Sequence, residues 1–184
     1  MYLSFDSLSI MVTSSTHMIV WIGLGNPGKK YAQTRHNAGI LVLNNMVSLS
    51  WKENPSLKAY TAEVPGHYFL FPTTYMNHSG QALGAFMKKY ASKVKAIVVF
   101  HDEIELPPGA IKAKESGGHK GHNGLRDIIQ VLGNGDFFRI RIGVGRPPGG
   151  EVANYVLSHW PEQDRPGKAE VTEAIESLQL QHPF

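Results

Sequence analysis

The chain is 184 residues long, 42% hydrophobic and 18% charged, and it contains no cysteine. This length and composition are typical of one globular domain and argue against a disordered or fibrous protein. Without cysteine, disulfides, thiolate metal sites and a cysteine nucleophile are excluded, and the chain fits a reducing compartment such as the cytoplasm. The formal net charge of +3 permits an RNA or phosphate partner but does not require one. No apolar run reaches the roughly 18 residues of a membrane span.

Residues 1–17 differ in character from the rest of the chain. They mix apolar and hydroxyl side chains, contain Asp6 and have no lysine or arginine, which excludes the basic start of a secretory signal. Met11 and Met18 are alternative starts. We expect residues 1–17 to form a poorly ordered N-terminal extension and residues 18–184 to form a single domain.

The spacing of apolar residues predicts the secondary structure. Strands are predicted where apolar and β-branched residues run between turn residues, at 18–22, 57–64, 67–71, 96–100, 110–114 and 138–144. Helices are predicted where apolar residues recur at helical spacing, at 37–49, 79–90, 123–132 and 161–180. This alternation predicts an α/β fold: a single globular domain whose mixed, largely parallel sheet is flanked by helices in three α/β/α layers.

The first predicted strand runs into a Gly-x-Gly-x-x-Gly pattern that begins at Gly23 and matches the dinucleotide-binding fingerprint. In that fingerprint a helix opens within the turn, and an acidic residue follows about 20 residues later. Here Pro27 lies within the turn, the helical pattern begins near residue 37, and the acidic position is taken by Asn44 and Asn45. The pattern therefore indicates a tight turn that needs glycine rather than a nucleotide site.

Residues with catalytic or binding potential gather in segments that follow buried strands or open helices. They are Asn26, Tyr31, His36, Asn37, Met76, Asn77, His101, Asp102, His122 and Asn123. In α/β sheets such segments meet at the carboxyl ends of the strands. A histidine beside a carboxylate and several amides suits hydrolysis by a held water, because the histidine accepts a proton, the carboxylate orients it and the amides donate to an oxyanion. Each residue has a structural alternative, such as an asparagine that caps a helix, and spacing alone leaves both interpretations open.

Four segments resemble the motifs of a known family. They are residues 31–39 (YAQTRHNAG), 72–80 (PTTYMNHSG), 101–109 (HDEIELPPG) and 118–128 (GHKGHNGLRDI). Their order and approximate spacing resemble those of the bacterial-type peptidyl-tRNA hydrolase family, and the likeness runs from about residue 18 to beyond residue 157. Several long motifs in order are far more specific than one short glycine pattern.

The resemblance implies an enzyme that hydrolyses the ester between a peptide and the 3′ end of tRNA, and so recycles tRNA from prematurely released peptidyl-tRNA, without a metal or cofactor. It implies that His36 is the catalytic general base and that Asp102 orients it. It assigns to substrate binding Asn26, Tyr31, Asn37, Met76, Asn77, His122 and Asn123, and to tRNA phosphates Lys114 and Arg141. The expected partner is peptidyl-tRNA, with no DNA and no membrane, and the family is usually monomeric.

The sequence departs from the family pattern in three places. Asn44 stands where an acidic residue is usual, residues 1–17 have no counterpart, and the chain ends before the full C-terminal helix. We expect these departures to affect stability or tRNA contacts more than catalysis. Two alternatives remain: a non-catalytic RNA-binding protein on the same scaffold, against which His36 and Asp102 argue, and a metal-dependent hydrolase built on His119-x-x-His122, which has no acidic third ligand nearby in the sequence.

Overall fold

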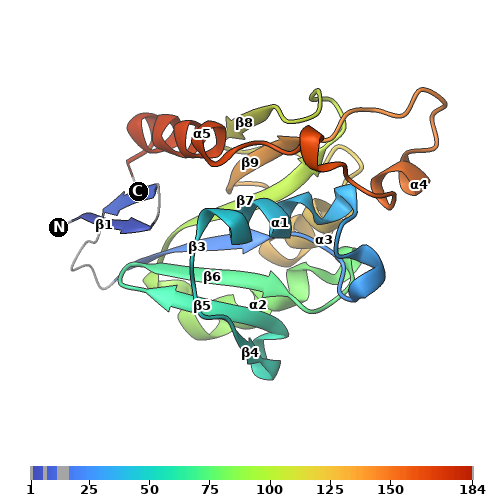
Figure 1. Ribbon diagram of the computed structural model, residues 1–184. Helices are drawn as coiled ribbons and strands as arrows, with labels where there is room; N and C mark the ends of the chain where they lie inside the picture. The colour runs from blue at the N-terminus through green and yellow to red at the C-terminus, as the bar shows by residue number, and fades with distance from the viewer. Residues whose placement is uncertain (1, 6–7, 12–16, 184) are drawn as a thin grey trace.

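The computed structural model describes residues 2–5, 8–11 and 17–183. Its main sheet has seven strands in the order β4-β5-β6-β3-β7-β9-β8 (Figure 1). The strands are β3 (Met18–Gly23), β4 (Lys52–Asn54), β5 (Ala59–Val64), β6 (His67–Pro72), β7 (Val94–Glu103), β8 (Ile111–Lys114) and β9 (Phe138–Gly143). Strand β3 pairs in parallel with β6 and β7, and β7 pairs in parallel with β9, whereas β4–β5, β5–β6 and β8–β9 are antiparallel. The predicted mixed sheet with a parallel centre is confirmed.

Helices cover both faces of this sheet. They are α1 (Ala38–Met46), α2 (Gly80–Tyr90), α3 (Asn123–Leu132), α4 (Val152–Val156) and α5 (Lys168–Gln181), with the short 3-10 helices η1 (Lys29–Tyr31), η2 (Arg35–Asn37), η3 (Pro55–Leu57), η4 (Met76–His78), η5 (Ala91–Lys93) and η6 (Glu162–Asp164). Figure 1 shows α1 and α5 on one side of the sheet and α2 and α3 on the other. The predicted three-layer arrangement is therefore confirmed.

The alternation of side chains along β3 accounts for a core on each face of the sheet. Ile19 and Trp21 belong to the cluster that contains the buried residues of α1 and α5, whereas Val20 and Ile22 belong to the cluster of α2 and α3. All four side chains are buried. Because helices cover both faces of this central strand, neither face contacts water, and its sequence is therefore a continuous apolar run.

Several predicted boundaries and elements differ from the structure. Strand β7 extends beyond residue 100 to Glu103, because residues 101–103 continue the parallel pairing with β9. The C-terminal helix α5 begins at Lys168 rather than near residue 161. The elements β4 and α4 were not predicted, since they have only three and five residues and are too short for a periodic pattern.

The segment before β3 forms a separate small feature. Strands β1 (Tyr2–Phe5) and β2 (Leu8–Met11) pair antiparallel in a two-stranded sheet of their own. The predicted poor order of residues 1–17 concerns in part residues 1, 6, 7 and 12–16, which lie outside the described residues, so it stays a prediction. Across the described ranges, no helix combines the length and the apolar character that crossing a bilayer requires.

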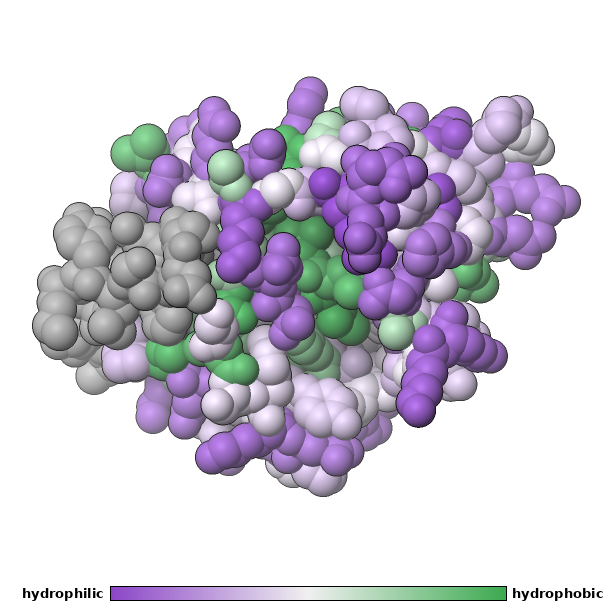
Figure 2. Space-filling model, viewed as in Figure 1, coloured by the Kyte–Doolittle hydropathy of each residue, from purple (hydrophilic) through white to green (hydrophobic). Residues whose placement is uncertain are grey.

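The parallel strands β3, β6, β7 and β9 run in the same direction, so their carboxyl ends meet at one edge of the sheet. The connecting segments η1, η2, η4 and α4 follow the ends of β3, β6 and β9, at the right-hand end of Figure 1. On the face shown in Figure 2, hydrophilic side chains cover most of the surface, and apolar surface gathers in a hollow near its centre. The strand ends are the expected place for a site in an open α/β sheet.

Candidate active site

A cleft opens at this carboxyl edge. Its lining comes from η2, the end of β7, strands β8 and β9, the glycine-rich segment 118–121, the start of α3, and α4. Among the lining residues are several that the sequence predicts for the site, namely His36, Asp102, Lys114, His122, Asn123 and Arg141. The fold thus brings together residues that are far apart in the chain.

Two histidines share one carboxylate oxygen within the cleft. The Nδ1 atom of His36 lies 2.8 Å from Oδ1 of Asp102, and the Nε2 atom of His122 lies 2.9 Å from the same oxygen. The two imidazole rings are 5.0 Å apart between centroids, and both Asp102 and His36 are buried. Because an ionised carboxylate is the better acceptor for two N–H donors, this geometry favours the charged form of Asp102.

Backbone hydrogen bonds fix the tautomer of His122. Its Nδ1 atom accepts from the N–H groups of Gly124 and Leu125 at 3.1 and 3.3 Å, so the ring caps the N-terminus of α3. A ring nitrogen that accepts carries no proton, and in the neutral ring the proton therefore sits on Nε2 and is donated to Asp102. The cap of this helix is therefore His122, and Asn123 is the first residue of the helix.

Burial and charge act in opposite directions on the pKa of His36. Removal of the ring from water lowers its pKa, but the charge of Asp102 and the hydrogen bond to it together outweigh burial, so the pKa is raised above the ordinary 6.5. Burial by itself raises the pKa of Asp102, and the two histidines reverse this effect and hold that pKa well below its usual range. A proton on Nδ1 of His36 leaves the lone pair of Nε2 available as a base.

A third histidine adjoins this group. The Nδ1 atom of His101 donates to the carbonyl oxygen of Asp102 at 2.8 Å, and its buried Nε2 atom has no hydrogen-bond partner among the described residues. Burial first, and then the proximity of His122, lower the pKa of His101 to about 3, so the ring stays neutral. The sequence points to His101 as a candidate without giving it a role, because its isolation from water is visible only in the fold.

Two of the predicted asparagines hold the backbone of the site together. The side chain of Asn37 binds Asn26 twice: its Oδ1 accepts from the Asn26 backbone N–H at 2.8 Å, and its Nδ2 donates to the Asn26 carbonyl at 3.0 Å. The Oδ1 atom of Asn26 accepts the backbone N–H of Met76 at 2.8 Å. Asn37 thus positions Asn26, and Asn26 joins the loop after β3 to η4. The Nδ2 group of Asn26 has no hydrogen-bond partner within the described part of the chain.

The other residues predicted for substrate binding lie in the core or at the surface. Met76 is buried in the core cluster of α2 and α3, so its side chain is structural. Tyr31 stands edge-on to the exposed Tyr75, with ring centroids 6.3 Å apart. Asn77 and Asn123 are both exposed. Of the predicted residues, Asn123 lines the cleft, whereas Tyr31, Met76 and Asn77 do not.

The cations that line the cleft differ in whether another group of the protein already binds them. The Nε and Nη2 atoms of Arg141 both lie 3.0 Å from Oε2 of Glu103, so this predicted tRNA contact is ion-paired. Arg139 is buried, and its Nη1 atom donates to the carbonyl of Gly118 at 2.7 Å. Burial, and then Arg141, lower the pKa of Arg139. Lys114 forms no ion pair with any described residue.

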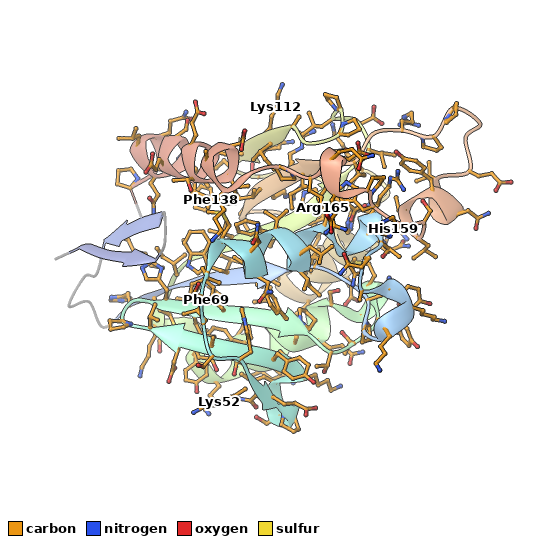
Figure 3. All side chains as sticks on the ribbon, viewed as in Figure 1. Lys52, Phe69, Lys112, Phe138, His159 and Arg165 are labelled. Atoms are coloured by element: carbon orange, nitrogen blue, oxygen red, sulfur yellow. The ribbon has the colours of Figure 1, made fainter. Side chains whose placement is uncertain are left out.

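A set of contacts between η2 and the segment that follows α4 was not predicted. The Nη1 atom of Arg35 donates to Oγ of Ser158 at 2.7 Å and to the carbonyl of His159 at 2.5 Å, and its guanidinium lies over the ring of Tyr155 at 4.3 Å. Figure 3 shows that His159 and Arg165 belong to the segment that follows α4 and returns past the start of α1. Because Arg35 directly precedes the predicted base, the α4 wall of the cleft is tied to the element that carries this base.

Three side chains of the site also have donor atoms close enough to share a metal ion. The donor atoms of His36, Asp102 and His122 lie within 4.8 Å of one another. His119 is not part of this group, and its Nδ1 atom instead accepts from the backbone N–H of Gly121 at 3.0 Å. The pair His119-x-x-His122 is therefore not arranged as two ligands of one metal. In the group of His36, Asp102 and His122, both histidines already donate a proton to Asp102, and a metal bound there would have to displace these protons.

A histidine with a raised pKa, oriented by a buried carboxylate beside amide donors and cations, is characteristic of hydrolases that activate water. This is the class that the fold and the site define. The family model described as Peptidyl-tRNA hydrolase matches residues 20–181. The chain belongs to the peptidyl-tRNA hydrolase family.

Individual relatives agree with this family. The peptidyl-tRNA hydrolase of Citrifermentans bemidjiense is 40% identical over 167 residues, which cover 86% of this chain and 88% of the relative. That of Coxiella burnetii is 47% identical over 150 residues, covering 78% and 79%. The crystal structure of peptidyl-tRNA hydrolase from Acinetobacter baumannii is similar with a TM-score of 0.71 at 36% identity, over 91% of this chain and 86% of that chain.

Proposed function

We propose that this chain hydrolyses the ester bond between a peptide and the 3′ end of tRNA, with His36 as general base and Asp102 as its orienting partner. The observation that carries the proposal is the 2.8 Å contact between Nδ1 of His36 and Oδ1 of Asp102, at a cleft that also contains cations. A proton on Nδ1 leaves the Nε2 lone pair free to take a proton from water. The names of the relatives support the substrate class.

In the proposed reaction, Nε2 of His36 takes a proton from a water molecule as the water oxygen attacks the ester carbonyl. The imidazolium that forms is stabilised by the charge of Asp102. The carbonyl oxygen becomes an oxyanion, to which the amide Nδ2 group of Asn123, which lines the cleft, is able to donate. We assign the Nδ2 group of Asn26, which has no partner within the described residues, to the same role. When the intermediate collapses, the bond to the ribose oxygen breaks and that oxygen receives the proton from His36. The products are a peptide acid and a free tRNA.

The remaining predicted residues take different parts in this proposal. Asn37 and Met76 act on substrate through Asn26, since both use their hydrogen bonds to hold it. Tyr31 and Asn77 keep their predicted role in substrate binding. Among the cations, Lys114 and Arg141 are assigned to tRNA phosphates, and part of the Arg141 charge is offset by Glu103. We further propose a cytoplasmic monomer that acts on RNA and not on DNA.

The test compares N-blocked aminoacyl-tRNA with its unblocked counterpart. The protein should release the amino acid from the blocked substrate alone, and a chelator should not change the rate. His36→Ala should bind tRNA and melt as the unmodified protein does, but lose about 10²–10⁴-fold in turnover, the usual contribution of a general base. The matched control is His182→Ala, which alters a histidine at the end of α5. Full activity of the His36 variant would refute the base assignment, and no release by the unmodified protein would refute the function.

A further inference from the structure

Residues 119–122 form a tight turn in the wall of the cleft. The backbone N–H of His122 donates to the carbonyl of His119 at 2.8 Å, and the two residues between them, Lys120 and Gly121, have φ values of 45° and 86°. Positive φ at both central positions is the pattern of a type I′ turn, in which glycine, asparagine and aspartate are preferred. Lysine in the first central position is unfavourable, because its Cβ crowds the backbone in the left-handed conformation.

The conformation of the turn does not itself require a lysine. Lys120 is exposed, and the next residue, Gly121, has open space where a side chain would be. The described residues include one other non-glycine residue with positive φ, Lys58 (φ 50°). The Nζ atom of Lys58 donates to Oε1 of Gln81 at 2.7 Å, whereas the Nζ atom of Lys120 has no partner in the described ranges. The ammonium group of Lys120 is therefore free to bind something that the protein itself does not supply.

The position of Lys120 indicates what that ligand is. Lys120 lines the same cleft as His36 and two other cations, of which Arg141 is ion-paired with Glu103 and Arg139 donates to a backbone carbonyl. An ester substrate that reacts at His36 has no free carboxylate at its scissile end, so the anions near that end are the phosphates of the RNA. A lysine ammonium is a compact point charge suited to a phosphate.

We propose that Lys120 binds a phosphate near the 3′ end of the RNA, and that the turn keeps an unfavourable lysine because of this contact. The proposal rests on the proposed function of the site. It adds to the predicted contacts of Lys114 and Arg141 a cation that lies within segment 118–128 but to which the family resemblance assigns no role. According to this proposal, the Lys120 side chain has two opposite effects: it destabilises the turn and strengthens binding of the substrate.

Variants at this position separate charge from backbone strain. Lys120→Arg keeps both the charge and the strain, Lys120→Gln loses the charge and keeps the strain, and Lys120→Gly loses both. Lys58→Gly is the matched control, because it relieves the same kind of strain at a residue that does not line the cleft. The measurements are kcat/KM for N-blocked aminoacyl-tRNA at several salt concentrations, and the melting temperature.

Both the glutamine and glycine variants at position 120 should lose about 2- to 5-fold in kcat/KM at low salt, the range for one accessible ion pair. The log–log dependence on salt should become shallower by about 0.7, as expected for one lost contact to single-stranded RNA. The arginine variant should keep both properties. Lys120→Gly and Lys58→Gly should each raise the melting temperature by about 2–4 °C, and the Lys58 variant should leave the salt dependence unchanged.

Two outcomes would overturn the inference while leaving the proposed function intact. One is an active protein whose salt dependence is the same with glutamine or glycine at position 120, which would make Lys120 a solvated surface residue. The other is an arginine variant that is as impaired as the glutamine variant, which would assign the effect to the shape of the turn instead of its charge. If the unmodified protein releases nothing from N-blocked aminoacyl-tRNA, both proposals fail together.

Discussion

Replacing Asp102 by asparagine removes a charge and largely preserves a shape. The Oδ1 atom of Asp102 accepts from His36 and His122 at 2.8 and 2.9 Å, and an amide oxygen in the same place can accept both bonds. What is lost is the negative charge, which together with the hydrogen bond outweighs burial and raises the pKa of His36. In Asp102→Asn burial becomes the larger influence, so the pKa of His36 should fall below its ordinary value.

The expected loss of activity in Asp102→Asn follows from the role of the Asp102 charge in the proposed reaction. In the proposed transition state His36 carries a positive charge next to the buried Asp102, and a hydrogen bond to a charged group contributes about 1.5–3 kcal/mol. Losing this contribution predicts a kcat/KM that is lower by about 10- to 150-fold near pH 8. If His36 is the base, the activity of the unmodified protein should fall as the pH drops through the raised pKa of His36, whereas His36 in the variant should stay unprotonated to lower pH. The deficit should therefore shrink between about pH 8 and pH 5.5.

The assay is kcat/KM for N-blocked aminoacyl-tRNA across this pH range at constant ionic strength. Asp136→Asn is the matched control, since Asp136 is an exposed carboxylate that does not line the cleft, and its profile should match that of the unmodified protein. A deficit for Asp102→Asn below about 3-fold, which is less than one charged hydrogen bond contributes, would refute the role given to Asp102. A larger deficit that is the same at every pH would show that the charge does not act through the pKa of His36.

Two further predictions concern stability. Burial lowers the pKa of His101 to about 3, whereas the pKa of an unfolded histidine is about 6.5. Between these two values the unfolded chain binds one more proton than the folded chain. The free energy of unfolding should therefore decrease as the pH falls through this window, by up to about 1.4 kcal/mol per pH unit. His101→Asn should make the free energy of unfolding, measured in urea, less dependent on pH there, and an unchanged slope would contradict this. Gly39→Ala should destabilise the fold by about 3 kcal/mol or more, because the added methyl would lie 2.6 Å from the backbone nitrogen of Leu24. The matched control is Gly84→Ala on α2, where the added methyl meets only the exposed side chain of Val131, and this change should be neutral or stabilising. Equal effects of the two changes on the free energy of unfolding, measured by chemical denaturation, would refute this reasoning.

The parts of the fold that the sequence predicted are those that depend on local periodicity. Strand β3 is predictable because both of its faces are buried, and α3 because its apolar residues recur on one face. The end of β7 was placed too early because His101, Asp102 and Glu103 are polar, and their strand conformation depends on pairing with β9. Polar residues that are buried by a neighbouring strand give no periodic signal of their own.

The sequence predicts which residues gather at the candidate site, but not the contact that each of them makes there. The resemblance brought His36 and Asp102 to attention, but it did not distinguish residues that face the cleft from those that hold its backbone. From the sequence, Asn37 is a candidate for substrate binding or for capping a helix. In the structure its side chain instead forms two hydrogen bonds with the backbone of Asn26, 11 positions earlier. Arg35 lies outside every predicted strand and helix, yet its guanidinium donates to Ser158, 123 positions later. Both contacts are tertiary, and no pattern in the neighbouring sequence encodes them.

The hydrogen bonds of the three histidines around Asp102 support the proposed base independently of the family. Both nitrogens of His122 are engaged, because Nδ1 accepts from the backbone of α3 and Nε2 binds Asp102. His101 has a free nitrogen, but that atom is shielded from solvent and the pKa of the ring is about 3, too low to take a proton from water efficiently. His36 combines a raised pKa with an Nε2 atom that remains available once Nδ1 binds Asp102. Of the three histidines that contact Asp102, His36 is therefore the best placed to act as the proposed base, and the hydrogen bond from His122 supports this role by holding the carboxylate in place.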